Sequence, residues 1–234
     1  MQKKTLMLLL TLLLPIFFIF SLFTPSLSNS ATISYYFDIN NEGIVGGPWG
    51  IVTLTENGPY QVDFIVDPFA SAFSTTSNFG LQTFGFNEST SNGTKLSVRN
   101  LPDGWGWHYE EDSESGFGPY QKFDLSTNGG GNNRQDPLTF SVVVLPLISP
   151  PNPVSYAFTI DISTFTTEFS TNNYLFAGHI AGFTASGSTG STTTSAYFST
   201  TGHPVTTVPE PATMLLLGSG LIGLAGFARK KFKR

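Results

Sequence analysis

Residues 49–66 read WGIVTLTENGPYQVDFIV, and this stretch decides the fold class of the chain. Apolar and polar residues alternate along Trp49–Thr55 and again along Tyr60–Val66, which is the period of a half-buried β-strand. Asn57-Gly58 lies between the two runs, and this dipeptide is typical of a tight turn between antiparallel strands. The stretch therefore predicts a β-hairpin.

The same alternation recurs along residues 31–183, where it predicts about ten short strands. The candidates are Ile33–Ile39, Trp49–Thr55, Tyr60–Val66, Phe84–Phe86, Lys95–Val98, Trp105–Tyr109, Gln121–Leu125, Leu138–Leu145, Ser155–Ile162 and Leu175–Phe183. Val62, Phe64 and Val66 are expected to face the core, with Ile65 as an apolar exception on the opposite face. No helical periodicity appears before residue 212. We therefore expect an all-β domain built as a β-sandwich or jelly roll.

Residues 184–207 are nearly all Ser, Thr, Gly and Ala, a composition typical of flexible linkers. We expect this segment to be a spacer that follows the β domain of residues 31–183. The proline-rich run at 149–153 reads SPPNP, and we interpret it as a surface loop because strands are predicted on both sides of it.

Charge is distributed unevenly along the chain. Residues 31–207 carry four basic and 15 acidic side chains, a formal charge of −11, while the other basic residues lie near the two ends. A surface this acidic repels phosphate backbones, which excludes nucleic acid as a partner. The chain has no cysteine, which excludes disulfides, thiolate metal sites and a cysteine nucleophile.

Residues 1–30 have the parts of a secretory signal peptide. Two lysines precede an almost continuously apolar run at 6–23, and small polar residues follow it. We expect signal peptidase to cleave after Ser30. Cleavage after Ala31 and an uncleaved anchor are the alternatives.

An uncharged apolar segment, Ala212–Ala228, lies close to the C-terminus. As a helix, these 17 residues would span about 25 Å, which is enough for a thin bilayer. A basic end follows, made of Arg229, Lys230, Lys231, Lys233 and Arg234. Such clusters stay in the cytoplasm, so we predict one transmembrane helix that anchors an exported domain in the inner membrane. A buried core helix is the alternative.

Val208-Pro209-Glu210-Pro211 stands directly before the apolar segment, and its prolines prevent a helix from starting earlier. With the apolar segment and the basic end, residues 208–234 resemble the PEP-CTERM sorting signal of Gram-negative bacteria. The resemblance implies that an exosortase recognises Pro209, Glu210 and Pro211 and removes the tail. It also implies transfer of the domain to the cell surface or extracellular matrix, in a pathway associated with exopolysaccharide and biofilm.

Trp105-Gly106-Trp107-His108-Tyr109 is the densest aromatic group of the chain. At a period of two residues, Trp105, Trp107 and Tyr109 share one face of a strand. If that face is exposed, the rings form a platform on which sugars could stack. The alternative is that these rings belong to the core.

The carboxylate run that follows contains Glu110, Glu111, Asp112 and Glu114. Hard oxygen ligands this close in sequence could bind Ca²⁺, the one cofactor that the sequence suggests. The spacing of an EF-hand is absent, and a solvated acidic loop is the alternative interpretation.

These observations favour a non-catalytic surface or matrix protein with a structural or adhesive role in exopolysaccharide. A carbohydrate-binding module that uses the aromatic platform, with or without Ca²⁺, is the second hypothesis. A polysaccharide-active enzyme is the third, because paired carboxylates on different strands of a jelly roll can cleave glycosidic bonds. No enzymatic activity is expected from any motif of the chain.

Overall fold

The computed structural model describes residues 30–90, 92–114, 117–120, 122–129, 133–147, 154–170, 172–187, 190, 192–207 and 219, and of 111–114 and 206–207 only the backbone. The predicted signal peptide at 1–30 and the predicted sorting segment at 208–234 lie outside the described residues, apart from Ser30 and Ser219. The strands all belong to one compact unit, Ser30–Val208.

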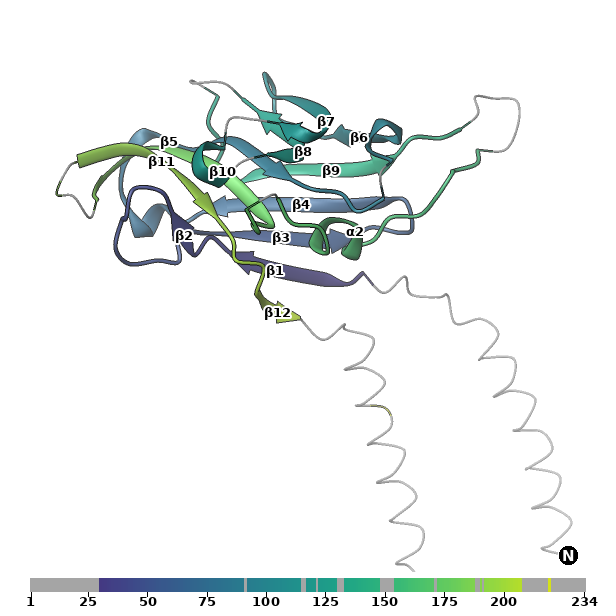
Figure 1. Ribbon diagram of the computed structural model, residues 1–234, viewed down its shortest axis with the longest axis horizontal. Helices are drawn as coiled ribbons and strands as arrows, with labels where there is room; N and C mark the ends of the chain where they lie inside the picture. The colour runs from purple at the N-terminus through teal and green to yellow at the C-terminus, as the bar shows by residue number, and fades with distance from the viewer. Residues whose placement is uncertain are drawn as a thin grey trace, which may run out of the picture. The chain divides into compact units, whose positions relative to one another are not determined.

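Twelve strands form two antiparallel sheets of six strands each (Figure 1). The first sheet has the order β12-β1-β3-β4-β9-β6, made of Pro204–Thr207, Thr32–Tyr36, Gly50–Glu56, Gln61–Pro68, Leu138–Val144 and Leu96–Arg99. The second sheet has the order β2-β11-β10-β5-β8-β7, made of Ile39–Asn40, Thr192–Ser199, Phe176–Ser186, Ser74–Phe86, Phe123–Asn128 and Gly106–Glu114. The predominance of β-structure is confirmed, and the β-sandwich or jelly-roll arrangement stays a prediction.

Strands β3 and β4 form the hairpin that the opening stretch predicts. Leu54 lies opposite Phe64, and the backbone N–H of Asn57 donates to the carbonyl of Gln61 at 2.9 Å to close the turn. The side-chain alternation is confirmed as well, because Phe64 is 1% exposed and its neighbour Ile65 is 44% exposed. Ile65 is thus the apolar exception that the sequence indicates.

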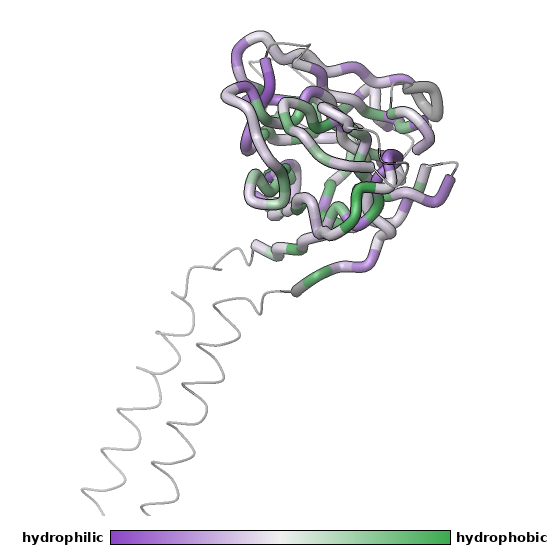
Figure 2. Tube along the Cα trace, turned by 90° about the vertical axis from the view of Figure 1, so that its left-hand side faces the viewer, coloured by the Kyte–Doolittle hydropathy of each residue, from purple (hydrophilic) through white to green (hydrophobic). Residues whose placement is uncertain are grey.

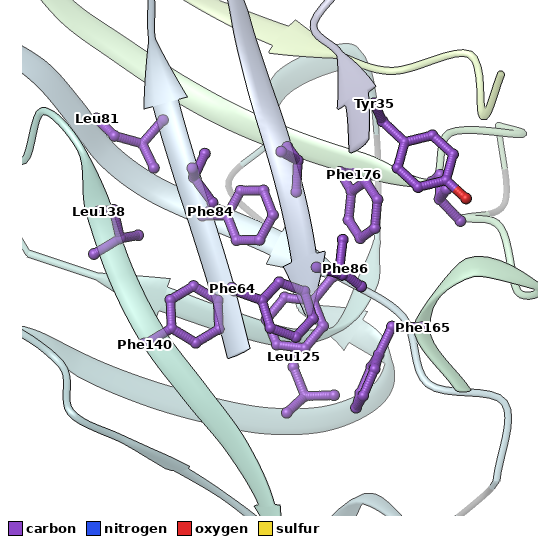
Figure 3. Packing of buried hydrophobic residues seen from close by; sticks show 14 of the residues in the cluster. Tyr35, Phe64, Leu81, Phe84, Phe86, Leu125, Leu138, Phe140, Phe165 and Phe176 are labelled. Atoms are coloured by element: carbon purple, nitrogen blue, oxygen red, sulfur yellow. The ribbon is translucent and has the colours of Figure 1, made fainter. Parts of the chain in front are cut away.

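Side chains from both sheets meet in one core that is dominated by phenylalanine. The ring of Phe64 on β4 stacks on Phe140 of β9, with centroids 4.9 Å apart, and lies edge-on to Phe176 of the second sheet at 6.5 Å. Figure 3 shows these rings pointing toward one another from the two sheets. Figure 2 shows green, hydrophobic segments and purple, hydrophilic segments within the trace of the β domain. Burial of these rings is the main source of stability of the domain.

The predicted spacer at 184–207 is wrong for most of its length. Strand β10 continues to Ser186, β11 pairs with β10 and β2, and β12 pairs with β1. Ala196 and Phe198 of β11 face the core, where they are 2% and 0% exposed. Threonine favours strands through its branched Cβ, so a Ser/Thr-rich segment with inward apolar residues completes a sheet here.

The predicted strand Ser155–Ile162 is also wrong, since the structure assigns no strand to the part that it describes. Ile160 is 2% exposed, and its backbone N–H donates to the carbonyl of Pro59 in the β3–β4 turn at 3.0 Å. A one-turn helix, α2 (Ser163–Thr166), follows and buries Phe165 against Phe64 with ring centroids 5.4 Å apart. The apolar residues of this segment thus cap one end of the core instead of adding a strand.

Two further predicted strands differ from the structure in their limits. Ile33–Ile39 divides into β1 and β2, which belong to different sheets, and Phe37 between them is fully buried. Phe84–Phe86 is only the end of the long strand β5.

Candidate functional sites

The predicted aromatic platform is not formed as a set of three rings. Trp105 precedes β7 and is 8% exposed, and its indole N–H donates to the backbone carbonyl of Asn133 at 2.6 Å. Tyr109 is half-buried and packs beside Gly93, where a Cβ atom would collide with its ring. Trp107 alone presents an exposed ring, with 38% of its surface accessible. The core alternative therefore describes Trp105, and sugar stacking stays a prediction for Trp107.

The predicted calcium residues Glu110, Glu111, Asp112 and Glu114 form the end of strand β7, so the alternative of an acidic loop is wrong. The register of β7 against β8 shifts between Tyr109 and Glu114. Of the four side chains the structure describes only that of Glu110, which is exposed. Among the described residues, no three His, Asp or Glu side chains gather closely enough to hold a metal ion. Calcium binding by this run stays a prediction.

A buried carboxylate pair that the sequence does not single out lies where β5 ends. Glu88 is 2% exposed and Asp124 is 3% exposed. The backbone N–H of Glu88 donates to Oδ2 of Asp124 at 3.0 Å, and the backbone N–H groups of Thr90 and Asn92 donate to the carboxylate of Glu88 at 2.8 and 3.0 Å. These buried acceptors are therefore engaged in holding the loop after β5.

His179 lies on the face of the second sheet that points away from the core. Its ring stacks on Tyr197 of β11, with centroids 4.4 Å apart. Burial lowers the pKa of His179 below its usual 6.5, and the positive charge of Arg134 adds to this shift. The neutral imidazole is therefore the form that the folded domain favours.

A cleft of about 350 Å³ opens beside the first and last strands of the domain. Its walls come from the end of β1, from the loop that leads into β3, and from the connection between β11 and β12. The residues that line it include Tyr36, Asp38, Gly47, Trp49, His203 and Val205. Its volume lies at the lower end of the range of small-molecule sites, about 300–1,000 Å³.

Backbone hydrogen bonds position the aromatic floor of the cleft. The N–H of Phe37 donates to the carbonyl of Gly50 at 2.9 Å, and the N–H of Trp49 donates to the carbonyl of Phe37 at 3.0 Å. The ring of Trp49 is 5% exposed and packs against Phe198 of β11, with centroids 5.7 Å apart. Gly47 lies over this ring, and a Cβ atom added at Gly47 would lie 3.1 Å from the nearest ring carbon of Trp49. A larger residue at that position would narrow the cleft.

Tyr36 and Asp38 supply the accessible groups of the N-terminal wall. The ring of Tyr36 is 37% exposed and lies edge-on to Phe69, with centroids 6.2 Å apart. The carboxylate of Asp38 accepts two hydrogen bonds from Thr201, at 3.0 Å from its N–H and at 2.5 Å from its hydroxyl. This pair fixes the carboxylate and ties the N-terminal part of the domain to the connection before β12.

Sequence reasoning did not find this cleft, because its two walls come from opposite ends of the domain. The C-terminal wall, around His203, lies in the segment interpreted as a flexible spacer. Pairing of β12 with β1 brings that wall beside Tyr36. A tyrosine two residues before an aspartate in a predicted strand such as Ile33–Ile39 is too common a pattern to indicate a site.

The sorting residues Pro209, Glu210 and Pro211 lie outside the described residues, directly after β12. A family model described as the PEP-CTERM protein-sorting motif matches residues 207–230. The chain therefore carries a PEP-CTERM sorting motif. Neither a curated protein nor a solved structure matches the chain. The motif indicates export, a membrane-anchored sorting signal and processing by an exosortase.

The predicted membrane span, Ala212–Ala228, also lies outside the described residues apart from Ser219, as do the basic residues after it. Within the part of the chain that the structure describes, no helix has the length and the apolar character needed to cross a bilayer. The span stays a prediction.

Proposed function

We propose that this protein is a non-catalytic structural or adhesive component of an extracellular polysaccharide matrix, displayed there after exosortase removes its tail. The observation that carries the proposal is the PEP-CTERM match at residues 207–230. The signal-peptide pattern of residues 1–30 agrees with it, because both ends of the chain then direct the same domain out of the cytoplasm.

The β domain supports a structural role through the way it uses its buried polar groups. The carboxylates of Glu88 and Asp124 accept backbone hydrogen bonds and hold a loop in place. The formal charge of −11 over residues 31–207 keeps the domain apart from other acidic surfaces and favours a hydrated matrix.

Processing is tested by replacing Pro209, Glu210 and Pro211 together with alanine, in cells with and without an exosortase. We expect the wild-type protein to lose its tail and reach the matrix fraction only when the exosortase is present. The alanine variant should keep the tail and remain in the membrane fraction in both strains. The readouts are the mass of the protein and its distribution between cells and matrix.

A matched control replaces the Pro-Asn-Pro sequence at residues 151–153 with alanine, because its two prolines have the same spacing as Pro209 and Pro211 but no long apolar segment follows it. This variant should be processed like the wild type. Processing of the 209–211 alanine variant at the wild-type rate would refute the sorting claim. The matrix role would be refuted by two results together: the processed protein does not enter the matrix fraction, and deletion of the gene leaves the biofilm mass unchanged.

A further inference from the structure

We infer that the cleft between the end of β1 and the start of β12 binds a neutral sugar unit of a polysaccharide. The inference deepens the proposed function and rests on it, because a matrix location is what surrounds the domain with polysaccharide. It differs from the predicted platform at Trp107, which lies on β7 at the edge of the second sheet.

The aromatic surface of the cleft suits the apolar face of a sugar ring. Tyr36 supplies the accessible ring, with 37% of its surface exposed. Trp49 lies beneath the cleft and offers no open face, since its ring is 5% exposed and is held between Gly47 and Phe198. The C–H groups on one face of a pyranose pack favourably on an exposed ring such as that of Tyr36.

The polar groups of the cleft suit sugar hydroxyls. Asp38 is held by two hydrogen bonds from Thr201, yet a carboxylate has about four acceptor positions, so it can still accept hydroxyl donors from a ligand. Adjacent hydroxyls of a pyranose present two such donors side by side. His203 lines the opposite wall and is exposed, and a ring nitrogen can donate to or accept from a further hydroxyl. The carboxylate of Asp38 is thus already held in position before a ligand binds, which reduces the conformational entropy lost on binding.

The charge of the cleft favours a neutral ligand over an anionic one. Among the described residues that line it, none is lysine or arginine, and Asp38 carries a carboxylate in a domain of formal charge −11. Uronate or sulfate groups would therefore be repelled. A proline-rich peptide is also less suitable, because it needs a groove of several exposed aromatic rings, whereas Tyr36 is the one large exposed ring among the described residues that line this cleft.

The test uses the full-length protein purified in detergent and titration calorimetry with defined probes. The neutral probes are cellohexaose, maltohexaose, laminarihexaose and chitohexaose, each at up to about 10 mM. Polygalacturonate oligomers and decaproline represent the two disfavoured ligand classes. We expect one or more neutral probes to bind. Tyr36→Ala should weaken that binding about tenfold and His203→Ala should weaken it measurably, while Tyr36→Phe keeps the ring and most of the affinity.

Ile65→Ala is the matched control, because its side chain is 44% exposed and is not among the residues that line the cleft. This variant should bind the neutral probes like the wild type. Circular dichroism of each variant checks that a loss of affinity is not a loss of fold.

Three results would overturn the inference: no neutral probe binds, a probe binds equally well to Tyr36→Ala and His203→Ala, or decaproline or polygalacturonate binds more tightly. Failure of the proposed function is distinguishable, because it appears in the cell fractionation. A protein that binds the probes but never reaches the matrix would leave the cleft assignment standing and remove the matrix role.

Discussion

Replacement of Phe64 with alanine should be among the most destabilising single changes in this domain. The ring is 1% exposed and contacts Phe86 and Phe140 at 4.9 Å, Phe165 at 5.4 Å, and Phe176 at 6.5 Å between centroids. Burying the roughly 200 Å² of an aromatic side chain contributes about 5 kcal/mol at about 25 cal/mol per Å². Alanine recovers little of this and leaves a cavity, so we expect a loss of about 4–5 kcal/mol in the free energy of unfolding.

The measurement is equilibrium urea unfolding of the purified fragment Ser30–Val208, followed by tryptophan fluorescence. Ile65→Ala is the control, because Ile65 is the next residue of β4 and its side chain is 44% exposed on the outer face. It should cost less than about 1 kcal/mol. Equal losses at the two positions, or a loss below about 2 kcal/mol for Phe64→Ala, would refute the assignment of the inner face of β4 and the two-sheet core built on it.

Three further predictions concern the corrected elements and one titration. Trp105→Phe removes the buried indole donor and should lower the free energy of unfolding by about 1–3 kcal/mol, whereas Trp107→Ala should change it by less than about 0.5 kcal/mol, as measured by the same urea unfolding. Ala196→Lys places a charge in the core and should cost more than about 3 kcal/mol, while Thr194→Lys on the exposed part of β11 should be nearly neutral. The pKa of His179 is lowered in the folded state, so its contribution to stability is complete above pH 6.5 and declines as the pH falls below that value. NMR titration of the folded protein should give a pKa below 6.5 for this residue. His179→Gln should reduce the dependence of the free energy of unfolding on pH.

Each of these expectations has a clear contrary result. If Trp105 and Trp107 variants unfold at the same urea concentration, the indole hydrogen bond contributes nothing measurable. Tolerance of Ala196→Lys would restore the interpretation of residues 184–207 as a flexible spacer. A His179 resonance that titrates at or above 6.5 would show that burial is not the dominant influence on this imidazole.

Alternation of apolar and polar residues predicts a strand correctly where that strand pairs with another strand close to it in the sequence. In the hairpin of β3 and β4 the two runs, the turn dipeptide and the outward Ile65 all agree, because local pairing and one-sided burial impose the period. The same alternation in Ser155–Ile162 does not make a strand, since that segment docks across the β3–β4 turn and its apolar residues cap the core. Period alone does not show whether a free sheet edge is available.

The segment 184–207 and the cleft were missed for a related reason. A Ser/Thr-rich composition describes a linker or an edge strand equally well, and Ala196 and Phe198 are the only pattern in it that indicates burial. Pairing of β12 with β1 depends on contacts between residues from opposite ends of the domain. The sorting motif needed no such contact, because it is read as a continuous segment and the family match at 207–230 confirms it.

The pairing of β1 with β12 has a mechanical consequence. Ile33 near the start of β1 lies opposite Thr207 at the end of β12, so both chain ends leave the domain at the same end of this ladder. Pulling the two ends apart would therefore open the ladder one pair at a time, like a zipper, instead of shearing all its pairs at once. Val205 lines the cleft and lies in β12 as well, so a load applied between a ligand held there and the end of β12 would pass along a strand of only four residues.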